Sequence, residues 1–227
     1  MARRRLLILL ILFLCLASLA VASFWLDNHY LLISFVLVLL SILPFFLRFE
    51  YKKIDAKEIV LIAMLSAIAA VSRIPFAPLP NIKPVTFIVI VSALVFGAEA
   101  GFIIGSTAAL VSNIFFGQGP WTPWQMFAWG MAGFVTGLFK DAKWLSRPLG
   151  RAVYGFIWGF LFDWFMNLSI VVGYINDFSW KTFLATYIAS FYFDLLHGGS
   201  NAIFLYVFGA SWIKMLERFK RKYGLLC

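Results

Sequence analysis

The sequence predicts an all-α integral membrane protein, and three observations support that fold class. Hydrophobic residues make up 63% of the 227 residues and charged residues only 13%, which is too little charge for the surface of a soluble domain. The hydrophobic residues form long unbroken runs, and inside a bilayer only helices or closed barrels satisfy every backbone polar group. The basic residues gather in alternate connections between those runs. Runs of this length favour spanning helices.

Eight apolar segments follow one another along the chain, and we interpret each as a membrane helix. A helix needs about 20 residues to cross a hydrocarbon core of roughly 30 Å. The segments are 6–25, 31–47, 58–72, 84–96, 99–115, 123–139, 152–175 and 187–212. The fourth and fifth segments are short, so a re-entrant hairpin is the alternative for that pair.

The first segment has a second interpretation as a secretory signal. Three arginines precede an apolar stretch that ends in the small residues Ala20, Val21 and Ala22, a pattern typical of signal cleavage sites. Because Met1 is retained, we expect an uncleaved first helix. Cys15 lies within this helix and Cys227 at the other end of the chain, so no intramolecular disulfide is expected.

The basic residues predict the orientation, since lysine and arginine near helix ends stay on the cytoplasmic side. Sixteen of the nineteen basic residues fall on one side of an eight-helix arrangement, and only Arg73, Lys83 and Lys181 fall on the other. Both termini are therefore expected to be cytoplasmic. This sorting, together with contact with anionic lipid, explains the net charge of +9, so no nucleic-acid partner is needed.

The charged connection 48–57 is the best internal boundary. It divides two N-terminal transmembrane helices, in residues 1–52, from a six-helix domain in residues 53–227. Polar residues at membrane depth occur only in the second part, so we expect the function there. Three of its connections, 74–84, 116–123 and 176–181, are irregular, and the first two are rich in proline. All three are predicted on the outer side.

Small residues recur at four-residue spacing, which lets helix backbones approach closely. Gly97, Gly101 and Gly105 form one series, and the other pairs are Gly133 with Gly137, Gly155 with Gly159, Ala63 with Ala67, and Ser66 with Ala70. Packing within the chain is one interpretation of such pairs. Docking on a partner membrane protein is the other.

Polar residues deep in the apolar segments are costly and usually face a cavity or the protein interior. Asp163 and Asn167 lie one helical turn apart in the seventh segment, while the eighth carries Ser190, Asp194, His197 and Asn201 at helical spacing. Asn113 closes the fifth segment, and Trp124 and Gln125 open the sixth. Together they predict a partly polar cavity that opens outward. The alternative is that Asp163 and His197 merely pair to hold the bundle.

Catalytic and metal-binding patterns are weak in this sequence. His29 and His197 are the only histidines and are far apart, so no metal site is expected. A phosphate-binding glycine loop and a Gly-x-Ser-x-Gly motif are both absent from the sequence. The chain is therefore not expected to be an enzyme.

The six-helix part resembles the substrate-binding S components of energy-coupling factor (ECF) importers, which carry an Ala-x-x-x-Ala motif on their first helix. Ala63 and Ala67 match that motif, and the three irregular connections match the loops that close the family's outer substrate pocket. Two stretches resemble the cobalamin branch of the family, namely residues 81–86 and residues 112–126. The two extra N-terminal helices depart from the six-helix pattern.

The resemblance implies a multi-pass subunit in a prokaryotic plasma membrane that binds cobalamin or a cobinamide-like precursor from outside, as transported substrate rather than as cofactor. It implies docking through Ala63 and Ala67 on a membrane scaffold (T) subunit, and inward release by toppling when two cytoplasmic ATPase subunits hydrolyse ATP. Combined with the polar positions, it gives the expected substrate-binding residues Asn81, Asn113, Gln118, Trp121, Trp124, Gln125, Asp163, Asn167, Asp194 and His197.

Two other functions stay open at the level of sequence. A polytopic membrane enzyme could act on a lipid or prenyl substrate through Asp163 and Asp194, although such enzymes usually present paired acids at the cytoplasmic side. A stand-alone secondary transporter is expected to show an internal repeat and a coupling-ion site, and the sequence shows no convincing repeat.

Overall fold

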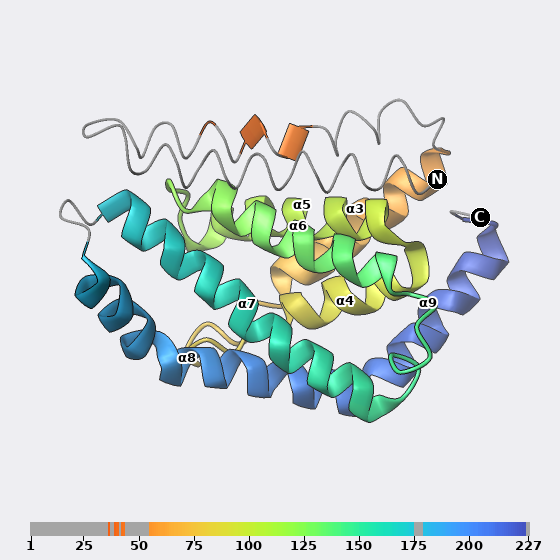
Figure 1. Cartoon of the computed structure of the whole chain (residues 1–227). Coiled ribbons are helices and arrows are strands. Elements are labelled where there is room, and N and C mark those ends of the chain that lie inside the picture. The colour runs from red at the N-terminus through yellow and green to blue at the C-terminus, as the bar shows by residue number, and fades with distance from the viewer. Residues whose placement is uncertain (1–35, 37–38, 41, 44–54, 175–178, 226–227) are drawn as a thin grey trace, which may run out of the picture.

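The computed structural model describes residues 36, 39–40, 42–43, 55–174 and 179–225, and in the two long ranges the chain is all-helical (Figure 1). Its elements are α3 (Ala56–Val71), α4 (Val85–Phe96), α5 (Ala98–Phe116), α6 (Thr122–Leu138), α7 (Pro148–Tyr174), α8 (Trp180–Val207) and α9 (Gly209–Tyr223). The two predicted N-terminal helices lie outside the described ranges, apart from a few residues of the second.

Local signals in the sequence set several of the helix ends. The side chain of Asp55 accepts from the backbone N–H of Lys57 at the start of α3, and the Ser179 hydroxyl accepts from the N–H of Thr182 at the start of α8. Both are N-caps, which satisfy backbone donors that the first turn leaves without partners. Gly97 separates α4 from α5 with φ of 91°, a conformation that favours glycine.

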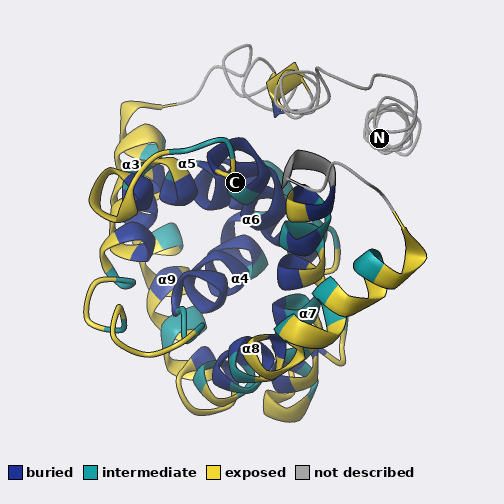
Figure 2. Cartoon of the chain, turned by 90° about the vertical axis from the view of Figure 1, so that its left-hand side faces the viewer, coloured by how far each residue is buried: buried dark blue, intermediate teal, exposed yellow. Residues whose placement is uncertain are grey.

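Helix α4 lies at the centre of the described bundle, with the other helices around it (Figure 2). Eleven of its twelve residues are buried, which fits a segment that is apolar except for Thr86 and Ser92. At about 1.5 Å per residue α4 is roughly 18 Å long, too short to cross a bilayer core alone. The re-entrant alternative therefore stays open for α4. By contrast, α5 and the Pro148–Val171 part of α7 are each long and apolar enough to cross.

Glycines form the contact between α5 and α6. A Cβ atom added to Gly133 would lie 2.1 Å from the carbonyl oxygen of Gly101, and one added to Gly105 would lie 2.2 Å from the carbonyl oxygen of Trp129. Helices α7 and α8 approach in the same way, because a Cβ on Gly159 would lie 2.5 Å from the Cα of Gly198. These glycine series thus lie in seams between helices of the same chain.

Replacing Gly133 with alanine is expected to destabilise the bundle by about 1–3 kcal/mol, the usual cost of overpacking. The added methyl group meets backbone atoms of α5, which no side-chain rotation can move. Gly199→Ala is the matched control, because a Cβ there meets nothing within 4 Å. Thermal unfolding of the detergent-purified protein measures both. Equal melting temperatures for the two variants would contradict the close contact of α5 with α6.

The all-helical fold was predicted correctly, but the last predicted segment, 187–212, was wrong at both ends. Helix α8 begins at Trp180 and ends at Val207, and a separate helix, α9, follows from Gly209. The apolar run continues through Trp212, so composition hides the break at Phe208. The sequence interpretation uses the basic residues after Trp212 only to predict the orientation. In the structure they belong to an amphipathic helix, α9.

The connections lie at two ends of the bundle. The α5–α6 connection lies at one end, while the α4–α5 turn, the α6–α7 connection and α9 lie at the other (Figure 1). The α3–α4 loop reaches α8 in the first of these halves, where Asn81 contacts the backbone of Phe193. We call the first end the loop end. It carries the candidate site.

Candidate functional site

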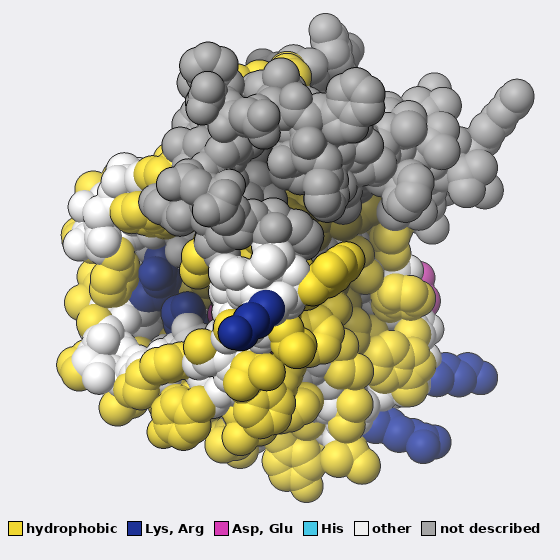
Figure 3. Space-filling model, turned by 60° about the vertical axis from the view of Figure 1, so that its left-hand side comes forward, with side chains coloured by type: hydrophobic (Ala, Val, Ile, Leu, Met, Phe, Trp, Pro, Cys, Tyr) yellow, Lys and Arg dark blue, Asp and Glu magenta, His cyan; other side chains and the backbone are white. Residues whose placement is uncertain are grey.

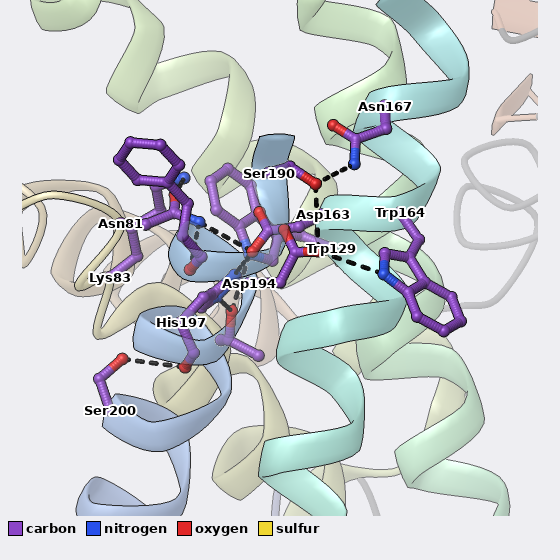
Figure 4. A network of polar contacts seen from close by, with 12 residues as sticks. Asn81, Lys83, Trp129, Asp163, Trp164, Asn167, Ser190, Asp194, His197 and Ser200 are labelled. Atoms are coloured by element: carbon purple, nitrogen blue, oxygen red, sulfur yellow. Dashed lines mark hydrogen bonds and ion pairs between the residues drawn. The ribbon is translucent and has the colours of Figure 1, made fainter. Parts of the chain in front are cut away.

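A chain of hydrogen bonds between buried side chains crosses the interior of the bundle near the loop end (Figure 4). It begins at Trp129 on α6, whose Nε1 donates to Thr86 Oγ1 on α4 at 3.0 Å. Thr86 Oγ1 lies 3.0 Å from Nε2 of His197 on α8, and His197 Nδ1 lies 2.9 Å from Oδ2 of Asp163 on α7. Four helices are joined in this way, and we call these four residues the central network.

The donors and acceptors of the central network fit one arrangement of protons. An indole N–H can only donate and a carboxylate can only accept. Thr86 therefore accepts from Trp129 and can donate its own proton to His197 Nε2, while His197 Nδ1 donates to Asp163. With this assignment every hydrogen-bonding group in the central network has a partner, and the imidazole of His197 is neutral. A fully satisfied buried network of this kind holds its helices in one relative position.

The α3–α4 loop is tied to the same carboxylate. Asn81 Nδ2 donates to Asp163 Oδ2 at 2.8 Å and to the carbonyl oxygen of Phe193 at 2.9 Å, and Lys83 Nζ donates to Asn81 Oδ1. Asn81 has φ of 56° and is the one non-glycine residue with positive φ in the described ranges. Asparagine tolerates this conformation better than most residues, and such positions gather at functional sites. Asn81 thus fastens the loop over the central network.

Lys83 brings a positive charge to this loop. Its ammonium nitrogen lies 5.7 Å from the ring centroid of Phe162, a cation–π arrangement. Burial lowers the pKa of Lys83, the negative charge of Asp163 opposes that shift, and the positive charge of Arg73 adds to it. The loop end therefore places a cation next to a carboxylate and an aromatic face.

A second group of polar residues adjoins the central network between α7 and α8 (Figure 4). Asn167 donates to the Ser190 hydroxyl at 2.6 Å, and Ser190 and the indole N–H of Trp164 both contact Asp194 Oδ2 at 3.2 Å. Asp194 is 1% exposed, and its other carboxylate oxygen, Oδ1, has no hydrogen-bond partner in the described part of the chain. A buried acceptor without a partner is costly. A polar group of a bound ligand would supply the hydrogen bond that Asp194 Oδ1 lacks.

A third group joins the α3–α4 loop to the α5–α6 connection. Arg73 donates to Ser112 Oγ at 2.5 Å and to Asn113 Oδ1 at 3.1 Å. Asn113 donates in turn to Thr122 at 3.0 Å and to Gln125 at 2.8 Å. Within this group Thr122 donates to Gln118 Oε1 at 2.9 Å, and Gln118 donates to the carbonyl oxygen of Leu110. Two of the predicted outer loops are thus held together through Arg73.

The guanidinium of Arg73 also connects this third group to the central network. It lies 4.5 Å from the ring centroid of Phe116 and 5.3 Å from that of Trp129. Burial lowers the pKa of Arg73 to about 10, so it remains a cation at neutral pH. Figure 3 shows a mainly hydrophobic surface around this end, with basic side chains in a hollow. The described basic residues at this end are Arg73, Lys83 and Lys181.

The structure distributes the ten predicted binding residues over these three groups and their surroundings. Asn81, Asp163 and His197 come together directly, Asn167 and Asp194 adjoin them, and Asn113, Gln118 and Gln125 belong to the Arg73 group. Trp121 is 39% exposed, whereas Trp124 is 3% exposed and packs on Phe165 with ring centroids 5.2 Å apart. The Asp163–His197 pair expected from the bundle-holding alternative is formed, but within a longer network that reaches a loop.

Sequence reasoning missed four residues of the site, namely Thr86, Trp129, Arg73 and Lys83. A threonine and a tryptophan within apolar segments look like ordinary packing residues, and although Thr86 ends the stretch 81–86 that resembles the cobalamin branch, nothing assigned it a role of its own. Arg73 and Lys83 did give a signal. They are two of the three basic residues that the sequence places on the side opposite the other sixteen, against the usual preference of basic residues for the cytoplasmic side. A basic residue on the predicted outer side needs a local reason to be there, and both are hydrogen-bonded in the site.

The fold and the site together define a helical protein with a polar site beneath the loops at one end and, in the described ranges, two helices long and apolar enough to cross a membrane. Residues 57–209 match the model of the family described as "ECF transporter, substrate-specific component", and the chain belongs to that family. Membership in this family implies a membrane protein of the substrate-specific component type, as the resemblance predicted. The match covers α3 to α8 and ends at the first residue of α9.

Curated relatives match a shorter part of the chain. A UPF0397 protein of Vibrio atlanticus (strain LGP32) is 30% identical over 90 residues, which is 37% of this chain and 49% of that protein. UPF0397 proteins of Aliivibrio fischeri (strain MJ11) and Aliivibrio salmonicida (strain LFI1238) are each 28% identical over 91 residues, 38% of this chain and 49% of theirs. The chain thus spans about half the length of the curated relatives it matches. No solved structure matches it.

Proposed function

We propose that this chain is the substrate-capturing subunit of an ATP-driven vitamin importer in a prokaryotic plasma membrane, with cobalamin or a cobinamide-like precursor as its cargo. The cargo binds at the loop end, which faces outward. The chain then docks on a membrane scaffold subunit, topples, and releases the cargo inward when two cytoplasmic ATPase subunits hydrolyse ATP. Family membership supports the division of labour, and the site supports capture at the loop end.

The observation that carries the proposal is the attachment of the α3–α4 loop to a buried carboxylate. Asn81 bonds Asp163 at 2.8 Å, and Asp163 is in turn bonded to His197 between α7 and α8. A ligand that competes with Asn81 for Asp163 breaks this attachment and changes the position of the loop. Binding and loop closure are thereby coupled through a few hydrogen bonds, and each is worth more in a water-excluded interior than on a surface.

The composition of the loop end suits a large ligand with both apolar and polar surface, as a corrinoid is. Ligand sites combine mostly apolar walls with a few placed polar groups. Here the aromatic groups are Phe116, Trp121 and Trp129, and the polar groups come from the central network and the Arg73 group. The choice of cobalamin within that class rests on the resemblance of residues 81–86 and 112–126 to the cobalamin branch.

The docking face is proposed on α3. Ala63 and Ala67 are exposed on this helix, in a stripe with Val60, Met64 and Ile68, whose side chains are 58%, 49% and 41% exposed. Ser66 and Ala70, on the adjacent stripe, are buried within the bundle. Of these two pairs, Ala63 with Ala67 is therefore the one that the described part of the chain leaves exposed for contact with another membrane protein. Small residues there allow a partner helix to approach closely.

Uptake of radiolabelled cobalamin tests the proposed function. Cells that lack their own cobalamin importer are given this chain together with scaffold and ATPase subunits, and we expect saturable uptake that stops when the ATPases are inactivated. Entry of another vitamin but not of cobalamin or cobinamide would remove the cargo from the proposal. Uptake that persists without any ATPase would favour a stand-alone secondary transporter.

A further inference from the structure

The end of the bundle opposite the loop end contains a cavity that the proposed function does not use. It has a volume of about 320 Å³ and lies between α9, the C-terminal part of α4 and the α6–α7 connection. Its lining includes three basic residues, Lys140, Arg151 and Lys214, and one acidic residue, Glu217. The charge balance of the lining is therefore positive, which favours an anionic ligand.

Arg151 is the unusual residue of this cavity. It is only 3% exposed, and its NH1 donates to the carbonyl oxygens of Leu145 and Ser146 at 3.2 and 2.8 Å. Its Nε and NH2 atoms are buried and have no hydrogen-bond partner in the described part of the chain. A guanidinium carries five N–H donors in a planar fork, so most of its donors remain unused. Leaving a buried charged donor unpaired is costly.

The backbone around Arg151 is shaped to hold the guanidinium in place. Gly209, the first residue of α9, packs against it, because a Cβ added there would lie 3.0 Å from Arg151 Nε. Helix α9 is also fixed to α4, since Lys220 Nζ donates to the carbonyl oxygen of Val95 at 3.0 Å. The cavity is thus a built feature with an oriented cation at its base.

Helix α9 continues the positive surface away from the cavity. Lys214, Arg218 and Lys222 recur every four residues along one stripe, with the half-exposed apolar side chains of Met215 and Phe219 beside them. Basic residues next to apolar ones on a helix are typical of elements that lie at the membrane surface and attract anionic lipids. Lys214 belongs both to this stripe and to the cavity.

We propose that this cavity binds a phosphate group, as carried by the headgroup of an anionic phospholipid, with Arg151 at its base and Lys140 and Lys214 at its rim. Arginine binds phosphate oxygens through two parallel N–H bonds, and the unused Nε and NH2 atoms of Arg151 are adjacent on one edge of the fork. Met215 and Phe219 offer apolar surface where acyl chains of the same lipid would lie. The site is independent of the cargo.

Native mass spectrometry and thermal unfolding of the purified full chain test this site with three probes, namely phosphatidylglycerol, phosphatidylcholine and inorganic phosphate. We expect retained phosphatidylglycerol and a melting temperature several degrees above that with phosphatidylcholine. Stabilisation by inorganic phosphate to the same extent would support the phosphate site and identify free phosphate as its source. Equal binding of both lipids, with no effect of phosphate, would overturn the proposal.

Substitutions distinguish lipid binding in the cavity from a general effect of positive charge on the surface. Arg151→Gln is expected to weaken phosphatidylglycerol binding at least tenfold. Because that variant also loses contacts to Leu145 and Ser146, Lys140→Gln combined with Lys214→Gln provides a second test at exposed positions, with an expected loss of the same sign. Arg147→Gln is the matched control, exposed in the same connection and outside the cavity lining. Equal loss in the control and in both test variants would show a non-specific charge effect and contradict the site.

Discussion

Replacing Asp163 with alanine is expected to abolish cargo binding and to lower the free energy of unfolding by about 1–3 kcal/mol, the usual cost of leaving a buried donor without its acceptor. The substitution leaves His197 Nδ1 without its acceptor and removes the group that holds Asn81, so the α3–α4 loop loses its attachment to the bundle. Equilibrium binding of labelled cobalamin and thermal unfolding measure the two effects on the same preparation.

Two control variants limit the interpretation of that result. Asp163→Asn keeps an acceptor oxygen for His197 while removing the charge, so we expect a smaller loss of stability than with alanine. Asp141→Ala removes a carboxylate at an exposed position at the other end of the bundle and is expected to change neither quantity. Unchanged cobalamin binding in a well-folded Asp163→Ala protein would contradict a role for the central network in capture.

Replacing Ala67 with tryptophan is expected to abolish co-purification of the chain with the scaffold subunit, while cargo binding by the isolated chain stays unchanged. Ala67 is exposed on α3 and lies on the side of the helix opposite the buried Ala69. A large side chain there meets no packed neighbour within the described chain, but it keeps a partner helix from approaching closely. Affinity capture of the scaffold in mild detergent provides the measurement.

Ala189→Trp is the matched control for Ala67→Trp, because Ala189 is also a small residue exposed on a membrane helix, α8. We expect it to leave scaffold capture intact. If Ala67→Trp lost cargo binding yet retained the scaffold, the α3 face would act within the chain and would not be the docking surface.

Much of the fold could be predicted because the bilayer imposes strong constraints on sequence. Apolar runs predict helices, and the observed α3 to α7 fall close to the predicted segments. Polar residues such as Asp163 and His197 stood out since each is expensive in an apolar segment. The break between α8 and α9 did not stand out, because the apolar composition continues through Phe208 and Gly209. Gly209 is a poor helix former, but a single glycine does not by itself end a helix.

The connections among the site residues could not be predicted, because they depend on how five elements come together. Thr86 acquires its role only when α4 lies beside His197, and Trp129 only when α6 brings its indole N–H to Thr86. Neither role can be predicted from the segment in which the residue lies. Trp124 shows the converse. Its place beside a proline-rich loop suggested a ligand contact, whereas the helical turn that begins at Thr122 directs it into the aromatic core against Phe165. Its proposed contact with the cargo stays a prediction.

The central claim is that the loop end faces outward, and labelling of two lysine positions tests it most directly. Lys181, in the first turn of α8, and Lys143, in the α6–α7 connection, are both exposed and lie at opposite ends of the bundle. In a background with Cys15 and Cys227 replaced by serine, Lys181→Cys should react with a membrane-impermeant maleimide in intact cells, and Lys143→Cys only after permeabilisation. The reverse pattern would place the site on the cytoplasmic side and contradict the account.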